Sequence, residues 1–289
     1  MQEFRYERPE SIAETVALLQ QHGSDAMLLA GGTDLVIELR ERRKHPGVVV
    51  DLKRVAELRP EISEKDGWIR ITASTVMADI VADERIQRWF PALGEAADVV
   101  GSIQIRNRAT MAGNICNGSP AADTAPPLLV YGAVVEVVGP RGTRRVPIDD
   151  FIIGVRKIDL GEAEFVSAME LPIPEKPVGS AYQRMTRRRG TDLASVTLCA
   201  GVDAAGVTRL AYGSVGPRAY LLVDDTGVLG DPDAPEEERR AILAAMFEGA
   251  SPSPTSMRAG PGYRVAMLPV LGERAVNKAI ERLREGSLV

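Results

Sequence analysis

The clearest chemical signal in the chain comes from two short glycine segments. Residues 27–35 read MLLAGGTDL, and residues 110–124 read TMAGNICNGSPAADT. Both place glycines, which carry no Cβ over the backbone, beside small hydroxyl and amide side chains. Main-chain N–H groups exposed in this way can bind phosphate oxygens. Two such segments in one domain indicate a ligand with two phosphates held between two lobes, and therefore a dinucleotide.

The two segments differ in how strongly they indicate a ligand. The first also fits an ordinary strand-to-helix turn, and neither matches the GxGxxG or GxxxxGK[ST] fingerprints of standard nucleotide folds. In the second, the apolar Met111 and Ile115 favour burial and would bury their polar neighbours with them. Buried polar side chains need hydrogen-bond partners. A polyhydroxyl ligand such as ribose or a ribityl chain would supply partners for three of them: Asn114, Asn117 and Asp123.

The side chains that most often carry redox or metal chemistry are scarce. The two cysteines, Cys116 and Cys199, form no CxxC motif, and an iron–sulfur cluster normally needs about four thiolates. The two histidines, His22 and His45, lie in polar surroundings without the spacing of metal ligands. We therefore expect no metal site on this chain, and any redox chemistry has to come from a bound organic cofactor.

The composition limits the partners and the compartment. The net charge is −5 and no extended basic stripe is present, which argues against nucleic acid as the main partner. No apolar run reaches the roughly 20 residues of a membrane span. The N-terminal sequence MQEFRYERPE is charged and lacks the apolar core of a signal peptide. A cytoplasmic protein is the expectation.

Regular elements around the first glycine segment would position it for phosphate binding. Ser11 and Glu14 form a capping box that predicts a helix ending near Gly23. A short buried strand is expected over 26–30, a helix over 33–43 and a second strand over 48–52. A strand that delivers glycines to the start of a helix has the geometry that binds phosphate.

The second glycine segment lies among weaker patterns. Strands are expected over 68–73, 133–138 and 165–171, and helices over 75–82 and after Pro91. Residues 100–124 are short on regular pattern and rich in small polar residues, so they are interpreted as more loop than element. A turn over 140–142 leads into a further strand.

A proline-rich linker divides the chain. Residues 172–179 read PIPEKPVG, and three prolines so close together stiffen a segment. Beyond it, strands are expected over 181–186, 194–202 and 207–212, followed by helices over 235–247 and 262–284. Three strands followed by two helices indicate a small α+β domain.

Four runs of the sequence resemble a known protein family. The runs LLAGGTDLV (28–36) and GSIQIRNRATMAGNICNGSPAADTAPPLLVYGA (101–133) strongly resemble the FAD-binding medium subunit of the molybdenum hydroxylases. That family includes the carbon monoxide dehydrogenase medium chain and the flavin domain of xanthine dehydrogenase. The runs AYQRMTRRRGTDLASVTLCAGV (181–202) and SPTSMRAGPGYRVAMLPVLGERAV (253–276) look like its C-terminal domain, so the resemblance covers the whole chain.

The resemblance implies an α+β fold in two domains. Residues 1–173 would form a two-lobed FAD-binding domain of the PCMH type, with lobes over about 1–57 and 58–173. Residues 174–289 would form a small α+β domain with an antiparallel sheet of about three strands plus helices.

The resemblance also implies the residues that bind FAD. The first FAD loop, which wraps the pyrophosphate with main-chain N–H groups, would comprise Leu29, Ala30, Gly31, Gly32, Thr33 and Asp34. The second loop usually reads T-x-G-G-N in the family, and its counterparts here are Thr110, Ala112, Gly113 and Asn114. Ala112 replaces the first of the two glycines, and a positive φ there would strain the backbone.

Further positions are implied around the flavin. Asp123 matches an acidic residue that accepts a hydrogen bond from a sugar hydroxyl of the cofactor. Val100 falls near the flavin ring, and Val166 falls on a strand lining the ring pocket. Arg184 and the loop 187–193 match a segment near the isoalloxazine edge. The three arginines at 187–189 either form a solvated charged face or attract a negatively charged acceptor such as NAD⁺.

The function implied by the resemblance is electron transfer. FAD, bound noncovalently, would take electrons from a [2Fe–2S] small subunit and pass them to NAD⁺, a quinone or another acceptor. A large subunit with the molybdopterin cofactor would supply those electrons, and the expected assembly is a dimer of heterotrimers. The cofactor carries such chemistry, so no catalytic nucleophile or general base is expected on this chain.

Two other functions remain possible from the sequence. One is a self-contained FAD-dependent reductase resembling enolpyruvyl-UDP-N-acetylglucosamine reductase, against which the C-terminal domain counts. The other is a scaffold subunit that has lost its flavin, against which the intact Gly31, Gly32, Gly113 and Asp123 argue. The substrate of the complex would be selected on the molybdenum subunit, and this sequence leaves it open.

Overall fold

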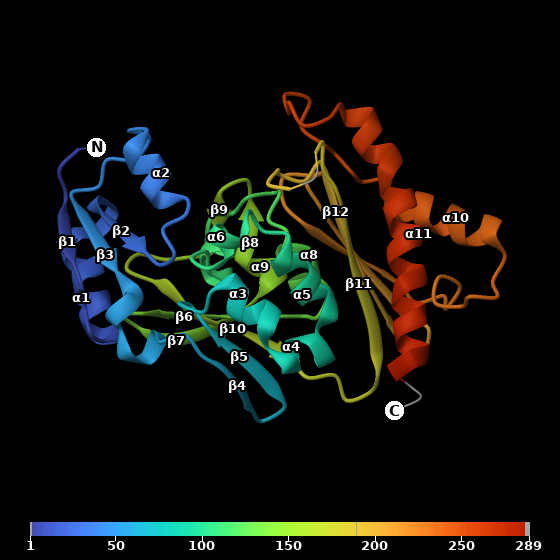
Figure 1. Ribbon diagram of the computed structural model, residues 1–289, viewed down its shortest axis with the longest axis horizontal. Helices are drawn as coiled ribbons and strands as arrows, with labels where there is room; N and C mark the ends of the chain where they lie inside the picture. Colours follow the sequence, from blue (N-terminus) through green and yellow to red (C-terminus); the bar gives the residue numbers. More distant parts are fainter. Residues whose placement is uncertain (1, 189, 287–289) are drawn as a thin grey trace.

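Three separate sheets follow one another along the long axis of the molecule (Figure 1). The computed structural model describes residues 2–188 and 190–286. Over these residues the strands form a three-stranded, a five-stranded and a four-stranded sheet, with a small two-stranded ribbon. Figure 1 shows the first sheet at the N-terminal end, the second in the middle and the third beside the long C-terminal helix.

The N-terminal lobe is a parallel sheet with strand order β1-β3-β2. Its elements are β1 (Arg5–Glu7), α1 (Ile12–His22), β2 (Ala26–Leu29), α2 (Leu35–Arg40) and β3 (Val48–Asp51), with the 3-10 turns η1 (Gly23–Asp25), η2 (Leu52–Arg54) and η3 (Ala56–Leu58). Ser11 caps α1 by accepting a hydrogen bond from the Glu14 amide. The helix predicted over 33–43 is shorter, because Arg42 adopts a left-handed backbone with a φ of 57°.

The central sheet is antiparallel, with strand order β4-β5-β10-β6-β7. Its strands are β4 (Ile62–Lys65), β5 (Trp68–Thr72), β6 (Val134–Gly139), β7 (Gly142–Pro147) and β10 (Phe165–Pro172). The ribbon consists of β8 (Ile152–Gly154) and β9 (Lys157–Ile158). The helices are α3 (Met77–Ala82), α4 (Glu84–Trp89), α5 (Pro91–Asp98), α6 (Ile103–Arg106), α7 (Met111–Cys116), α8 (Ala125–Val130) and α9 (Ile148–Phe151).

Residues 100–124 contain the two short helices α6 and α7, which the sequence pattern did not indicate. Most of the segment lies outside these helices, so the prediction of more loop than element is confirmed. The small polar residues that resembled a loop are helix caps: Ser102 accepts from the Ile105 amide and Thr110 from the Gly113 amide. Apolar side chains then fix α7 on the sheet.

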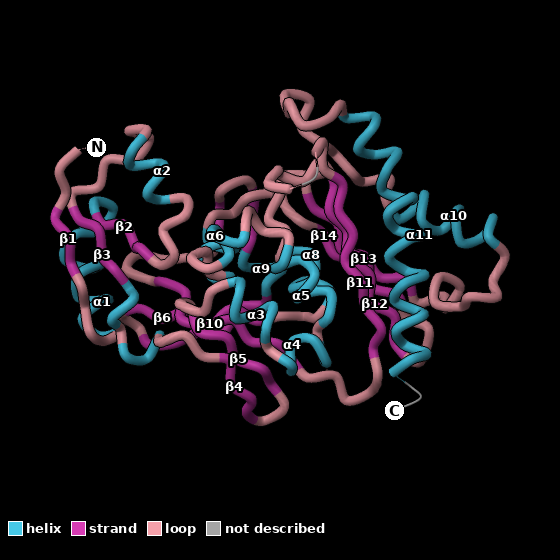
Figure 2. Tube along the Cα trace, viewed as in Figure 1, coloured by secondary structure: helices cyan, strands magenta, loops and turns pink. Residues whose placement is uncertain are grey.

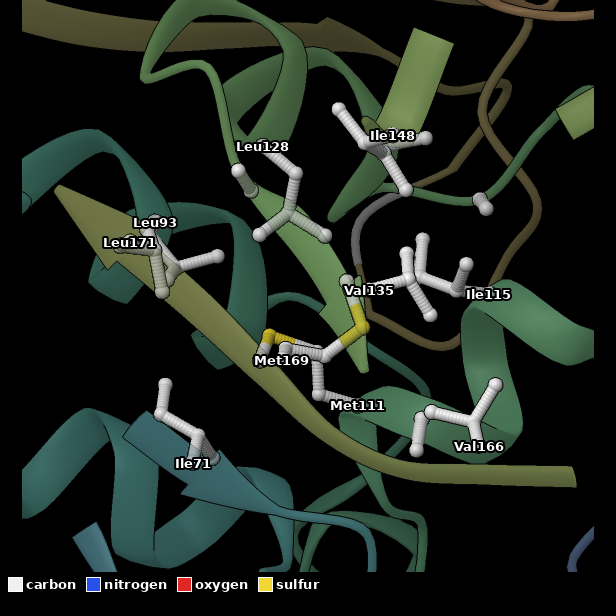
Figure 3. Close-up of a cluster of buried hydrophobic side chains, with 14 of the residues drawn as sticks. Ile71, Leu93, Met111, Ile115, Leu128, Val135, Ile148, Val166, Met169 and Leu171 are labelled. Carbon is white, nitrogen blue, oxygen red and sulfur yellow. The ribbon is translucent and has the colours of Figure 1, made fainter. Parts of the chain in front are cut away.

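The cluster in Figure 3 shows how α7 is held. Met111 and Ile115 of α7 lie among buried side chains of the central sheet, including Val135 of β6 and Met169 of β10. All four are almost completely buried. Burial of apolar side chains is the main stabilising contribution to such a core. The second glycine segment therefore sits on a rigid support.

The C-terminal sheet has four antiparallel strands in the order β11-β12-β13-β14. They are β11 (Val178–Met185), β12 (Val196–Asp203), β13 (Thr208–Gly213) and β14 (Tyr220–Asp224). The expected number was about three, and the missed strand is β14. Its short run YLLV follows Gly216 and Pro217 and does not alternate, so the sequence carries little strand pattern there.

Two helices cover one face of this sheet, α10 (Glu236–Met246) and α11 (Pro261–Gly286). Figure 2 shows α11 running along the strands β11 and β12. The helix α8 contacts β12 and β13, which joins the C-terminal sheet to the rest of the chain. None of the helices in the described ranges is both long and apolar enough to cross a membrane.

The proline-rich connection is shorter than expected. The strand β10 extends to Pro172 and β11 begins at Val178, so only residues 173–177 lie outside the strands. The division into domains at residues 173 and 174 stays a prediction. One hydrophobic cluster crosses that point, since Tyr182, Cys199 and Ala211 pack with residues of the central part.

Candidate functional site

Both glycine segments line one large cavity between the N-terminal lobe and the helices of the central sheet. Its volume is about 720 Å³, within the roughly 300–1,000 Å³ of typical small-molecule sites. Twelve of the predicted site residues line it: Ala30, Gly31, Gly32, Thr33, Asp34, Val100, Thr110, Ala112, Gly113, Asn114, Asp123 and Val166. The structure thus brings together positions far apart in sequence.

The first glycine loop follows β2 and reaches the segment before α7. A Cβ at Gly31 would lie 2.0 Å from the carbonyl oxygen of Arg108, so only glycine permits this approach. Gly32 has a φ of 76°, in the left-handed region that favours glycine. In the described part of the chain, the amides of Gly32, Thr33 and Asp34 donate to no protein acceptor. These donors border the cavity and fit phosphate oxygens.

The second glycine loop is the first turn of α7. Thr110 Oγ1 accepts from the Gly113 amide at 3.0 Å, and a Cβ at Gly113 would lie 2.9 Å from that oxygen. Ala112 lies in right-handed helical backbone, so replacing the family's glycine there brings no strain from a positive φ. Among the described residues its amide has no acceptor, which adds a donor at the cavity wall.

Asp123 places a carboxylate in this cavity although the residue is only 7% exposed. Burial raises the pKa of its carboxyl group, while Arg184 and the hydroxyl of Tyr182 act in the opposite direction. Tyr182 Oη donates to Asp123 Oδ1 at 2.6 Å. Within the described ranges, Asp123 Oδ2 has no hydrogen-bond partner. A sugar hydroxyl of a ligand could donate to that oxygen.

The polar and apolar walls together fit FAD. Main-chain donors can hold the pyrophosphate, and Asp123 can accept from the sugar. Asn114 Oδ1 accepts from Thr124 Oγ1 at 2.7 Å, which orients its amide at the cavity wall. Val100 and Val166 supply apolar surface for a ring, and Phe165 extends it. A β-bulge between Val166 and Ala168 changes the strand register at this wall.

Two predicted site residues lie outside the lining of the cavity as the described residues form it, Leu29 and Arg184. Leu29 ends β2, where its Cδ1 would be 2.8 Å from a Cβ at Gly32. Arg184 lies behind the wall. Its Nη1 donates to the Val99 carbonyl and its Nη2 to the Asp192 carbonyl, each at 2.7 Å.

The sequence alone did not reveal a polar group at the rim that links the N-terminal lobe to the rest of the chain. Arg156 Nη1 lies 3.2 Å from Glu38 Oε1 and 3.3 Å from Asn117 Oδ1. Burial and the neighbouring Glu38 raise the pKa of Asp34, and Arg156 lowers it. No local pattern indicates these contacts, because Glu38 and Arg156 are distant in sequence.

The arginine loop lies at the mouth of the cavity. Arg187 Nη2 lies 3.1 Å from Asp192 Oδ1, and Arg188 Nε lies 3.9 Å from Asp192 Oδ2. Arg188 and Asp192 also line the cavity. Arg189 lies outside the described residues. The two described arginines therefore share one carboxylate and leave a net positive charge at this edge.

Comparison with known proteins agrees with this geometry. Residues 2–174 match the family described as the FAD binding domain in molybdopterin dehydrogenase. The chain is 32% identical over 280 residues to the xanthine dehydrogenase FAD-binding subunit of Escherichia coli O157:H7, covering 95% of each chain. It is 32% identical over 283 residues to the carbon monoxide dehydrogenase medium chain of Hydrogenophaga pseudoflava, covering 96% of this chain and 98% of that one.

Solved structures show the same fold. A chain of carbon monoxide dehydrogenase from Hydrogenophaga pseudoflava superposes with a TM-score of 0.88 and 30% identity, covering 97% of this chain and 98% of that one. A chain of quinoline 2-oxidoreductase from Pseudomonas putida 86 gives 0.85 and 26%, with 97% and 98% coverage. The α+β fold, the FAD cofactor and the role as an oxidoreductase subunit are confirmed. The chain belongs to the family of FAD-binding domains of the molybdopterin dehydrogenases.

Proposed function

We propose that this chain is the FAD-carrying electron-transfer subunit of a molybdenum hydroxylase complex. It takes electrons from a [2Fe–2S] small subunit, which receives them from a large subunit holding the molybdopterin cofactor. It passes them to NAD⁺, a quinone or another acceptor, within a dimer of heterotrimers. The similarity to a FAD-binding subunit and to a medium chain over nearly the whole length supports this proposal.

The observation that carries the proposal is the meeting of both glycine loops and Asp123 in one cavity. FAD, when bound there, supplies the redox chemistry, since a flavin can exchange electrons one or two at a time. The residues of this chain bind and orient it. Free amides at Gly32 and Ala112 hold the pyrophosphate, Asp123 accepts from the sugar chain, and Val100 and Val166 exclude water beside the ring.

The cavity favours noncovalent binding. Cys116 is the thiol in its lining, and burial raises the pKa of that thiol to about 12. Such a cysteine stays protonated at neutral pH and is a poor nucleophile. We accordingly assign no catalytic nucleophile or general base to this chain, and its contribution to the reaction is binding, orientation and access.

We propose the domain division together with this function. Residues 1–173 form the FAD-binding domain, with lobes over about 1–57 and 58–173, and residues 174–289 form the C-terminal domain. The family match over residues 2–174 supports this division. The cavity lining crosses it, because Arg188, Thr191, Asp192 and Leu193 come from the C-terminal side.

The flavin content of the purified protein tests the proposal. The full chain should be yellow and should release an equimolar amount of unmodified FAD on acid treatment. Colourless protein that takes up no flavin on reconstitution would instead indicate a scaffold subunit. Yellow protein that alone reduces an enolpyruvyl sugar with NADPH would indicate the self-contained reductase.

Co-purification tests the proposed assembly. A tagged chain purified from the cells that naturally produce it should bring down a cysteine-rich small subunit and a large molybdenum subunit. Absorbance of the flavin in this complex should bleach when the reducing substrate of the large subunit is added. A complex that reduces its iron–sulfur centres while its flavin stays oxidised would contradict the proposed electron path.

A further inference from the structure

The C-terminal sheet reaches the cofactor cavity through its first strand, β11. Tyr182 and Arg184 are two residues apart on this strand, so their side chains leave the same face. That face is directed at the segments that line the cavity, since both side chains contact Asp123. Tyr182 is 6% exposed, and the Arg184 side chain is also largely buried.

Arg184 connects three separate walls of the cavity. Its Nη1 donates to the Val99 carbonyl at 2.7 Å, next to the lining residue Val100. Its Nη2 donates to the Asp192 carbonyl at 2.7 Å, in the loop at the cavity mouth. The same Nη1 lies 3.4 Å from Asp123 Oδ1. A planar guanidinium with five N–H donors suits this task better than a flexible ammonium.

Tyr182 and Arg184 approach the same oxygen of Asp123. Tyr182 Oη and Arg184 Nη1 both face Oδ1, which leaves Oδ2 without a partner among the described residues. Asp123 Oδ2 can therefore accept a hydrogen bond from a ligand that supplies a donor. Asp123 lines the cavity, so a bound molecule can reach that second oxygen.

We propose that Tyr182 and Arg184 are positioning residues that hold Asp123 so that its free oxygen accepts a hydroxyl of the sugar chain of FAD. The C-terminal sheet thereby completes a cofactor site whose other parts come from the first 173 residues. This inference rests on the proposed function, because it requires that the chain binds FAD.

The charges around Asp123 agree with this role. Burial raises the pKa of Asp123, and Arg184 and Tyr182 counteract it. Asn114 and Thr124 nearby are neutral, and burial raises the pKa of the Cys199 thiol, which pairs with Tyr182 across β11 and β12, well above its usual value. The charged groups around this site are Glu95, which accepts from the Tyr182 amide, and Arg188 and Asp192, which line the same cavity. Loss of either positioning contact should therefore make Asp123 protonate at a higher pH.

The first experiment measures FAD binding to the full chain as a function of pH. FAD is removed, and its dissociation constant is obtained by fluorescence titration for the wild type and for Tyr182→Phe. Hydrogen bonds to charged groups are strong, so we expect Tyr182→Phe to weaken FAD binding about tenfold at neutral pH. The loss of affinity on acidification should begin at a higher pH in the variant than in the wild type.

A double-mutant cycle separates positioning from general stability. Asp123→Asn removes the titrating carboxyl group. The FAD affinity of this variant should therefore lack the fall on acidification that protonation of Asp123 causes in the wild type. In the Asp123→Asn background, Tyr182→Phe should have little further effect, because its influence acts through Asp123. Arg184→Lys keeps the charge and should retain more affinity than Arg184→Met.

Tyr131→Phe is the matched control. Tyr131 is another buried tyrosine whose hydroxyl makes hydrogen bonds, to Ser180 and to the Ala92 amide, but it is not among the residues that line this cavity. Its replacement should lower the stability of the fold and leave both the affinity for FAD and its pH profile unchanged.

The outcomes separate the two proposals. A wild-type chain that binds no FAD would overturn the proposed function itself. A wild type that binds FAD, with Tyr182→Phe matching it in affinity and pH profile, would overturn only the positioning role. Equal losses for Tyr182→Phe and Tyr131→Phe, or full additivity with Asp123→Asn, would also overturn it.

Discussion

Single backbone positions decide how closely the first glycine loop can approach the second. At Gly31 the nearest atom to an added Cβ is a backbone oxygen, Arg108 O at 2.0 Å, which cannot rotate away. The position is therefore closed to any other residue unless the two segments separate. Because both segments line the cavity, separating them would also change the site.

We predict that Gly31→Ala destabilises the fold by about 2 kcal/mol, as expected for overpacking against a rigid neighbour, and strongly weakens FAD binding. Chemical denaturation and a FAD titration measure the two effects. Gly249→Ala is the control, because an added Cβ there meets no atom within 4 Å and the backbone is not left-handed. Equal losses of stability and of FAD affinity in the two variants would contradict the proposed role of Gly31 in the site.

At the scale of elements, α7 holds the second loop through one cap and two buried side chains. Thr110 caps the helix, and Met111 and Ile115 pack it on the central sheet. Ser11 performs the same capping task for α1, away from the cavity. The two caps make a matched pair, in which only one supports the proposed FAD site.

We predict that Thr110→Ala and Ser11→Ala each cost about 1 kcal/mol of stability, the usual cost of losing an N-cap. Only Thr110→Ala should also weaken FAD binding, because it releases the Gly113 amide and loosens the helix that carries the Ala112 donor. Unfolding curves and FAD titrations of both variants provide the comparison. An equal effect of the two on FAD affinity would argue against α7 as part of the site.

Local pattern explains which elements were predictable. The strands around Gly31, the helix capped by Ser11 and the long helix α11 have clear periodicity and appear as expected. In residues 100–124, polar side chains serve as caps of one- and two-turn helices, which a search for long amphipathic patterns overlooks. The edge strand β14 lacks alternation and is paired only through β13.

The candidate site was predictable only in its local motifs. Both glycine loops and Asp123 stand out in the sequence, and they meet in the cavity. The partners that support them come from far along the chain, as with Tyr182 for Asp123 and Arg156 for Glu38. Such contacts depend on tertiary packing, which local motifs do not reveal. Arg184, which the resemblance places near the isoalloxazine edge, lies outside the cavity lining that the described residues form.

At the scale of the whole molecule, an ion-pair cluster joins the C-terminal helix to the central part. Glu95 of α5 accepts from Lys278 and Arg282 of α11, and its second oxygen accepts from the Tyr182 amide at 2.9 Å. Burial opposes ionisation, yet these donors together hold the pKa of Glu95 below its usual value. The cluster thus stabilises the packing of β11 and α11 on α5.

The lowered pKa of Glu95 predicts a pH dependence of stability. A carboxyl whose pKa is lower in the folded state stabilises the fold above its unfolded pKa, and the contribution is lost as pH falls through the folded pKa. We expect Glu95→Gln to cost about 2 kcal/mol at neutral pH and to flatten the fall of stability in acid. Urea unfolding at several pH values measures this, and parallel curves for wild type and variant would contradict it.

A crystal structure of the full chain with FAD bound would show whether both glycine loops hold the cofactor. We expect the pyrophosphate against the amides of Gly32, Thr33 and Ala112, a sugar hydroxyl on Asp123 Oδ2 and the flavin ring beside Val100 and Val166. FAD bound elsewhere on the chain, or a pyrophosphate without contact to either glycine loop, would contradict this expectation.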